Sequence, residues 1–174
     1  MAADFFLEIV TKKGGKIKGE SLSAACTGQI EVSRFTIALN SPTAQDPDGQ
    51  HPAAARVNLE EAEFEFETSI ASTPLFQTLC TNDVIKEATL TCRRSGAGEG
   101  KEATFLQWRL HDARLVSYKM SGADDDTDDT IRIAYAGIEI LYRQQKADGS
   151  LSANMMAAYD AGENAMFSPT LGKK

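Results

Sequence analysis

Hydrophobic and polar residues alternate along most of this chain, as they do in β-strands that have one buried face. The first such run covers residues 5–10, where Phe5, Leu7 and Ile9 share one face. Further runs cover residues 57–68, 87–94 and 104–120. The pattern therefore predicts a protein built mainly of β-strands.

Two other runs change phase part-way, in residues 29–39 near Ser33 and in residues 131–142 near Gly137. One extra residue at each point, as in a β-bulge, would return all apolar side chains of the run to one face. Bulged strands bend. The pattern therefore indicates strongly curved sheets, as in a barrel or a tightly bent sandwich.

One short helix is expected between residues 67 and 94. Thr73 can cap its first turn, and Pro74 suits the first helical position because its missing N–H is not needed there. Apolar residues then recur at helical spacing up to Asn82, which is expected to end the helix. This apolar stripe consists of Leu75, Phe76, Leu79 and Cys80. Two or three turns are not stable alone in water, so we expect the stripe to pack on the sheet.

The longest stretch without apolar periodicity is residues 41–56, which is rich in proline and aspartate. Loops of about sixteen residues are usually functional or disordered. Beyond Gly149 the pattern weakens: Ser152 is expected to cap a short helix through Met155 and Met156, and residues 158–167 to form a closing strand before a frayed tail. All 174 residues (1–174) are expected to form one domain.

The composition narrows the function classes. The formal net charge is −7, so the chain would repel a phosphate backbone, and nucleic-acid binding is disfavoured. Three cysteines without C-x-x-C spacing indicate reduced thiols. No segment has the length or pattern of a membrane span or a signal peptide, so we expect no membrane insertion.

Candidate chemistry is weak. His51 and His111 are interpreted as ordinary surface histidines. Asp124, Asp126 and Asp128 copy the start of a calcium loop, but the required glycine and the final glutamate are missing. We interpret them as a solvated acidic turn.

Two further motifs fail on inspection. The glycine-rich residues 96–101 lack the first glycine and the Ser or Thr of a phosphate loop, and are better explained as a hairpin turn. The glutamates of residues 60–67 have no aromatic side chain on their face to stack on a sugar. We therefore predict no catalytic, cofactor-binding or metal-binding residues, no cofactor, and no enzyme.

Four stretches together carry a family resemblance. They are residues 17–21 (IKGES), 72–75 (STPL), 88–94 (ATLTCRR) and 138–149, which end in YRQQKADG. On these stretches the chain resembles the haemolysin-coregulated protein (Hcp) family, the tube-forming components of bacterial type VI secretion. The resemblance covers roughly residues 4–149, and the YRQQKADG run is its most specific part.

The resemblance implies a compact β-barrel of two packed sheets with one flanking short α-helix. It also implies a homo-hexameric ring that stacks into a hollow tube, is propelled by a contractile sheath and carries a VgrG-like spike protein. Small effector proteins would travel in the lumen. The protein would be synthesised in the bacterial cytoplasm and would leave through the type VI apparatus without a signal peptide.

In the Hcp family a long loop reaches toward the neighbouring ring, and its position here is residues 41–56. The candidate ring-stacking residues are Gln45, Asp46, Asp48, Gln50 and His51. Two alternatives stay open: a tail-tube protein of a phage or phage-derived particle, and an effector or ligand-binding β-barrel.

Overall fold

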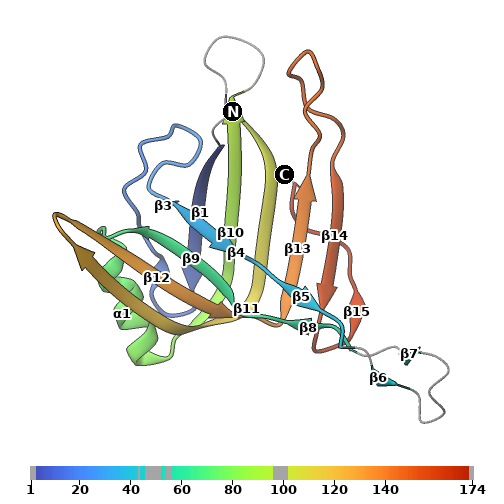
Figure 1. Cartoon of the computed structure of the whole chain (residues 1–174), viewed down its shortest axis with the longest axis horizontal. Coiled ribbons are helices and arrows are strands. Elements are labelled where there is room, and N and C mark those ends of the chain that lie inside the picture. Colours follow the sequence, from blue (N-terminus) through green and yellow to red (C-terminus); the bar gives the residue numbers. More distant parts are fainter. Residues whose placement is uncertain (1–2, 43, 46–51, 54–55, 96–101, 173–174) are drawn as a thin grey trace.

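The computed structural model describes residues 3–42, 44–45, 52–53, 56–95 and 102–172. Strands dominate, and one helix lies at the side of the sheet (Figure 1). The elements in chain order are β1 (Ala3–Thr11), β2 (Gly15–Lys16), β3 (Ile30–Val32), β4 (Arg34–Thr36), β5 (Leu39–Asn40), β6 (Ala44–Gln45), β7 (Pro52–Ala53), β8 (Asn58–Leu59), β9 (Ala62–Glu67), α1 (Ser72–Thr81), β10 (Val84–Ser95), β11 (Glu102–Ala123), β12 (Asp126–Ala134), β13 (Gly137–Tyr142), β14 (Met155–Asp160) and β15 (Ala165–Met166).

The strands form two layers. The chain passes from one layer to the other either within one long strand or at a break between two strands. The first layer has the order β15-β14-β13-β11-β10-β1-β2, and all its neighbours are antiparallel. The second layer, formed by β4, β9 and β12, crosses this one at an angle (Figure 1). The layers are joined by β11, whose first half pairs with β10 and β13 and whose second half pairs with β12. The mainly β class is thus confirmed, although the sheet does not close into a true barrel.

Both phase changes in the sequence mark points where the chain passes between layers. At Ser33 one strand ends and the next begins: β3 pairs with β1, whereas β4 pairs with β9. The backbone N–H of Ser33 donates to the Glu65 carbonyl at 2.8 Å. The second change separates β12 from β13, and the Ala136 N–H there donates to the His111 carbonyl at 3.2 Å. Strand breaks therefore stand where bulges were expected.

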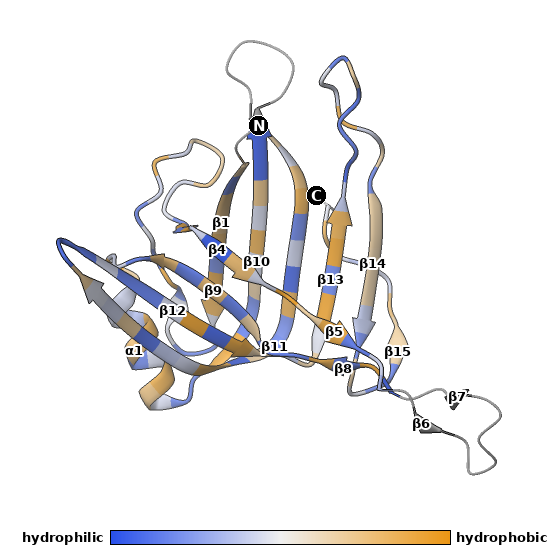
Figure 2. Cartoon of the chain, in the orientation of Figure 1, coloured by the Kyte–Doolittle hydropathy of each residue, from blue (hydrophilic) through white to orange (hydrophobic). Residues whose placement is uncertain are grey.

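The hydrophobic core lies between the two layers, and apolar and polar residues alternate along its strands (Figure 2). Its largest fully buried side chains are Phe64, Phe66, Leu7, Ile9, Ile30, Leu75, Ile85, Leu90, Leu110, Ile131 and Ile133. Phe5 and Phe35 also meet across the layers, edge to face, with ring centroids 5.2 Å apart. Such a pair adds specificity to the contact between the layers.

Helix α1 packs on the sheet through a narrower face than its sequence suggested. Leu75 is fully buried and Leu79 is half-buried, but Phe76 is 56% exposed and Cys80 is exposed as well. The stripe prediction was therefore wrong for Phe76 and Cys80. Ser72 and Thr78 are buried in their place, because both bond to nearby oxygen atoms.

The helix begins one residue before the expected cap, and Ala71 is the N-cap, without a capping side chain. Thr73 lies inside the first turn instead. The end is as predicted: Asn82 adopts a left-handed conformation with φ of 50°, which asparagine tolerates better than most residues.

The C-terminal region is extended where a short helix was expected. Met155 and Met156 belong to β14, which pairs with β13 from Tyr142 to Gly137. The helix prediction was wrong because pairing with β13 outweighs a weak local capping signal. A turn after Asp160 divides the expected closing strand into β14 and β15.

Candidate functional site

The described parts of residues 41–56 form a narrow ribbon that leaves the body of the protein (Figure 1). Ala44 pairs with Ala53, and Gln45 pairs with Pro52. Of the candidate ring-stacking residues, Gln45 lies in β6, while Asp46, Asp48, Gln50 and His51 lie outside the described residues. Their stacking role stays a prediction.

The aspartates that resemble a calcium loop lie on an open hairpin. Ala123 pairs with Asp126, so Asp124 and Asp125 form a two-residue turn between β11 and β12. Asp124, Asp126 and Asp128 are exposed, as expected for a solvated acidic turn. Within the part of the chain that the structure describes, no group of three or more His, Cys, Asp and Glu side chains could hold a metal ion. The glycine-rich residues 96–101 lie outside that part.

His111, the histidine that lies within the described residues, is not a simple surface residue. Its Nε2 lies 2.6 Å from Oε1 of Glu139, and its ring meets Phe167 edge to face at 5.9 Å. Glu139 is fully buried, although its place in the alternating run of β13 suggested an outward-facing side chain.

The buried Glu139 carboxylate holds the segment that follows β15. The N–H and hydroxyl of Thr170 donate to its two oxygens at 2.7 Å, and the N–H of Leu171 donates at 2.9 Å. Burial by itself raises the pKa of Glu139, but the bonds from Leu171, Thr170 and His111 outweigh it and lower the pKa below the ordinary 4.5. Arg109 also donates to the Thr170 hydroxyl at 3.0 Å. The carboxylate therefore stays charged and fixes the C-terminal segment.

A second buried carboxylate, Asp129 of β12, connects the helix with both layers. Its oxygens accept hydrogen bonds from the hydroxyls of Thr68, Ser72 and Tyr118, at 3.1 Å for Thr68 and Tyr118. Burial raises the pKa of Tyr118, and the bond to Asp129 and its negative charge raise it further. The hydrogen bonds of both carboxylates thus connect separate segments of the fold.

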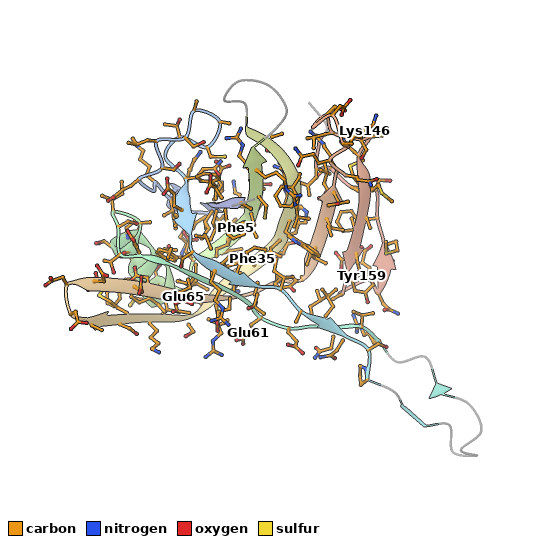
Figure 3. The ribbon with its side chains drawn as sticks, turned by 45° about the horizontal axis from the view of Figure 1, so that its top comes forward. Phe5, Phe35, Glu61, Glu65, Lys146 and Tyr159 are labelled. Carbon is orange, nitrogen blue, oxygen red and sulfur yellow. The ribbon has the colours of Figure 1, made fainter. Side chains whose placement is uncertain are left out.

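The outer face of the second layer is charged. Arg132 lies 3.4 Å from Glu61 and 3.6 Å from Glu63. In Figure 3, Glu61 and Glu65 lie on this outer layer, whereas Phe5 and Phe35 meet inside. The interpretation of residues 60–67 as a charged outer face agrees with this arrangement.

Two of the hollows on the described surface have contrasting linings. The larger, of about 670 Å³, lies between the β1–β2 turn and α1 and is named here the lysine groove. It is lined by Thr11, Lys13, Gly14, Lys16, Ile17, Lys18, Ile70, Pro74, Gln77, Thr78, Thr81 and Asp83. The smaller, of about 170 Å³, is almost entirely apolar and lies where β5 crosses β13, β14 and β15; its lining includes Leu39, Trp108 and Met166.

A family model described as "Type VI secretion system effector, Hcp" matches residues 6–142. This range contains the helix, the second layer and most of the first layer. The chain belongs to the Hcp family.

Relatives of the Hcp family agree with this assignment. The chain is 24% identical to "Protein hcp1" of Pseudomonas aeruginosa over 150 residues, which cover 86% of this chain and 89% of that protein. It matches the crystal structure of Hcp1 from Salmonella typhimurium with a TM-score of 0.76 and 21% identity, over 96% of this chain and 100% of that one. A structure described as a type six secretion system protein matches with a TM-score of 0.83 and 16% identity, over 95% and 100% of the two chains. At these identities the structural matches establish the fold.

Family membership supports a type VI secretion tube protein, and Hcp proteins are structural, secreted proteins, which suggests a function other than catalysis. Among the described residues, no helix is long and apolar enough to cross a membrane.

Proposed function

We propose that this chain is the structural subunit of a type VI secretion tube. Six copies form a ring, and rings stack into a hollow tube that is secreted. The observation that carries the proposal is the family match over residues 6–142, which includes every strand of the second layer and most of the first. The function is mechanical and needs no catalytic residue or cofactor.

The sheet edge supports assembly on physical grounds. Strand β15 pairs only with Tyr159 and Asp160 of β14, and no other strand of the described residues pairs with the outer edge of β14. Met155 and Met166 beside this edge are each 67% exposed. An open edge with apolar side chains favours pairing with another chain, and a head-to-tail interface that closes as a ring satisfies every subunit equally.

The partners follow from the same proposal. The ring carries small effector proteins in its lumen, a VgrG-like spike protein stands at the tip of the tube, and a contractile sheath surrounds it. The subunit is made in the bacterial cytoplasm and leaves through the type VI apparatus. Residues 41–56, with Gln45, Asp46, Asp48, Gln50 and His51, reach the neighbouring ring.

Solution mass tests the ring. Light scattering over a wide concentration range should show a species of about 113 kDa, six times the 18.8-kDa chain. A monomer that persists at every concentration would contradict the proposal.

Stacking is tested separately by electron microscopy. Reversing the charge of Asp46 and Asp48 to lysine should leave the mass of the ring unchanged and reduce the number of stacked rings. Unchanged stacking would assign the ring-to-ring contact to another surface.

A further inference from the structure

The hairpin between β11 and β12 projects from the body of the protein (Figure 1). All residues from 119 to 128 are exposed, so neither face of this part of the hairpin packs on the protein. Beyond the pairing of Asp128 with Glu67, no third strand of the described chain extends along it. A two-stranded ribbon is marginally stable alone in water, and contact with another surface would stabilise it.

The hairpin's side chains restrict which surface that can be. Its exposed end carries four aspartates and one lysine, Lys119, and one large apolar side chain, Met120, which is 52% exposed. The four aspartates are Asp124, Asp125, Asp126 and Asp128. Carboxylates lose hydration in a contact, and only cationic or hydrogen-bonding partners offset that cost. The apolar hollow over β13 and β14 is therefore a poor site for this hairpin.

The lysine groove has the complementary chemistry. Lys13, Lys16 and Lys18 line it and are exposed. Lys16 pairs with Glu8, but no carboxylate among the described residues pairs with Lys13 or Lys18. The one carboxylate that lines the groove, Asp83, already accepts bonds from the N–H groups of Lys13 and Gly14 at 3.2–3.3 Å.

The groove also offers an apolar contact for Met120. Ile17 and Pro74 line it together with Ile70, which is 57% exposed. Lysines beside an exposed isoleucine thus match aspartates beside an exposed methionine. Charge pairs at the rim of such a contact mainly set partner orientation and the rate of encounter.

We propose that the acidic β11–β12 hairpin of one copy docks in the lysine groove of the next copy. The aspartates face Lys13 and Lys18, and Met120 lies against Ile70. In the proposed ring the hairpin of each copy enters the groove of the next, so the contact is head-to-tail and repeats around the ring. This inference rests on the proposed ring and names two of its surfaces.

Charge exchange tests the contact in the full-length protein. Lys13→Glu with Lys18→Glu, or Asp124→Lys with Asp126→Lys, should each raise the concentration at which half of the assemblies dissociate by about tenfold or more. Combining the four substitutions should restore most of the loss, because the charges are exchanged but remain complementary. The matched control is Lys86→Glu with Lys146→Glu, which changes the net charge equally at two exposed lysines outside the groove and should leave the assembly unchanged.

Two results separate this inference from the proposed function. A wild-type ring that neither charge reversal weakens would overturn the hairpin contact and leave the tube function standing; a wild-type monomer would overturn both. Carbodiimide cross-linking of the wild-type ring, followed by peptide mapping, should join the hairpin aspartates to Lys13 or Lys18 of another copy. Cross-links from the hairpin only to other lysines would also overturn the proposed contact.

Discussion

At the residue scale, two fully buried carboxylates connect parts of the chain that are far apart in sequence. Glu139 holds Thr170 and Leu171, and Asp129 holds Ser72 at the start of the helix. A buried carboxylate is costly when its hydrogen bonds to water are not replaced. Here N–H and hydroxyl groups from other segments replace those hydrogen bonds to water. If these segments were displaced, the carboxylates would be buried without partners, so the contacts favour this one arrangement.

Replacing Glu139 with glutamine should lower the free energy of unfolding by about 2 kcal/mol, since the amide's NH₂ would face donors that now meet a carboxylate oxygen. Urea denaturation near pH 7 measures this loss. Hydrogen exchange should be faster at Thr170 and Leu171, because their N–H groups would then donate to a neutral amide oxygen and no longer to a carboxylate. The control is Glu63→Gln at the charged outer face, which should change stability by less than about 0.5 kcal/mol.

The pH dependence of stability gives a second test of Glu139. Its pKa is lower in the folded protein than the ordinary 4.5, so the unfolded chain takes up the proton first. Its stabilisation is present above about pH 4.5 and is lost as the pH falls through the folded pKa. The wild-type protein should therefore lose more stability than Glu139→Gln between about pH 6 and pH 3. Parallel pH curves for the two proteins would contradict this role.

Asp129 should control the titration of Tyr118. Burial raises the pKa of Tyr118 above its ordinary 10.0, and the hydrogen bond and charge of Asp129 raise it further. Asp129→Asn removes the charge and should bring the Tyr118 pKa back toward 10.0, as measured by NMR titration of labelled tyrosine rings. An unchanged Tyr118 curve would mean that burial alone sets its pKa.

At the element scale, two adjacent residues of the helix differ in burial: Leu75 is fully buried, whereas Phe76 is mostly exposed. Leu75→Ala should lower the free energy of unfolding by about 3 kcal/mol, because it leaves a cavity at a fully buried site. Phe76→Ala should cost about 1 kcal/mol or less, since its ring is more than half exposed; it meets the Tyr118 ring edge to face at 6.4 Å. Urea denaturation of both variants measures the two losses in the free energy of unfolding. Equal losses would show that Phe76 is more tightly packed than its exposure indicates.

Most strands could be predicted because alternation with period two reports directly on burial. Phe64 and Phe66 of β9, or Leu90 of β10, are buried as their pattern indicates. Met155 was predicted to be helical because the capping signal of Ser152 was the one local pattern before it, and that signal is weak. Pairing with Tyr142 decides its conformation, and that partner lies on another strand.

The buried carboxylate Glu139 and the lysine groove were less predictable, because both depend on segments that are distant in sequence. Glu139 lies between Ile138 and Ile140 and has the pattern of an outward-facing residue. Its face is covered by Thr170 and Leu171, which bond to it from about thirty residues further along the chain. No local pattern reports such a contact. The lysine-rich turn was visible in the sequence, but the groove requires α1 beside it.

At the scale of the whole molecule, the two ends of the first layer differ in their need for a partner. At one end, β1 pairs with β10 and also with β2 and β3. At the other, the described residues on the outer edge of β14 are the two of β15 and Phe167, whose N–H donates to the Ala158 carbonyl at 3.1 Å. Exposed methionines gather at this second end, and flexible apolar side chains of this kind adapt well to a partner surface. The asymmetry favours a head-to-tail assembly.

Substituting lysine for both Met155 and Met166 should therefore weaken assembly without unfolding the subunit. Lysine at an open edge opposes edge-to-edge pairing, because its charge would have to be buried in the contact. Both methionines are 67% exposed, so the free energy of unfolding should change by less than about 1 kcal/mol. Light scattering should show a shift toward the monomer. Leu22→Lys, at a residue 90% exposed outside every strand, is the control and should keep the wild-type mass. A double variant that assembles as the wild type does would place the ring interface elsewhere than the β14 edge.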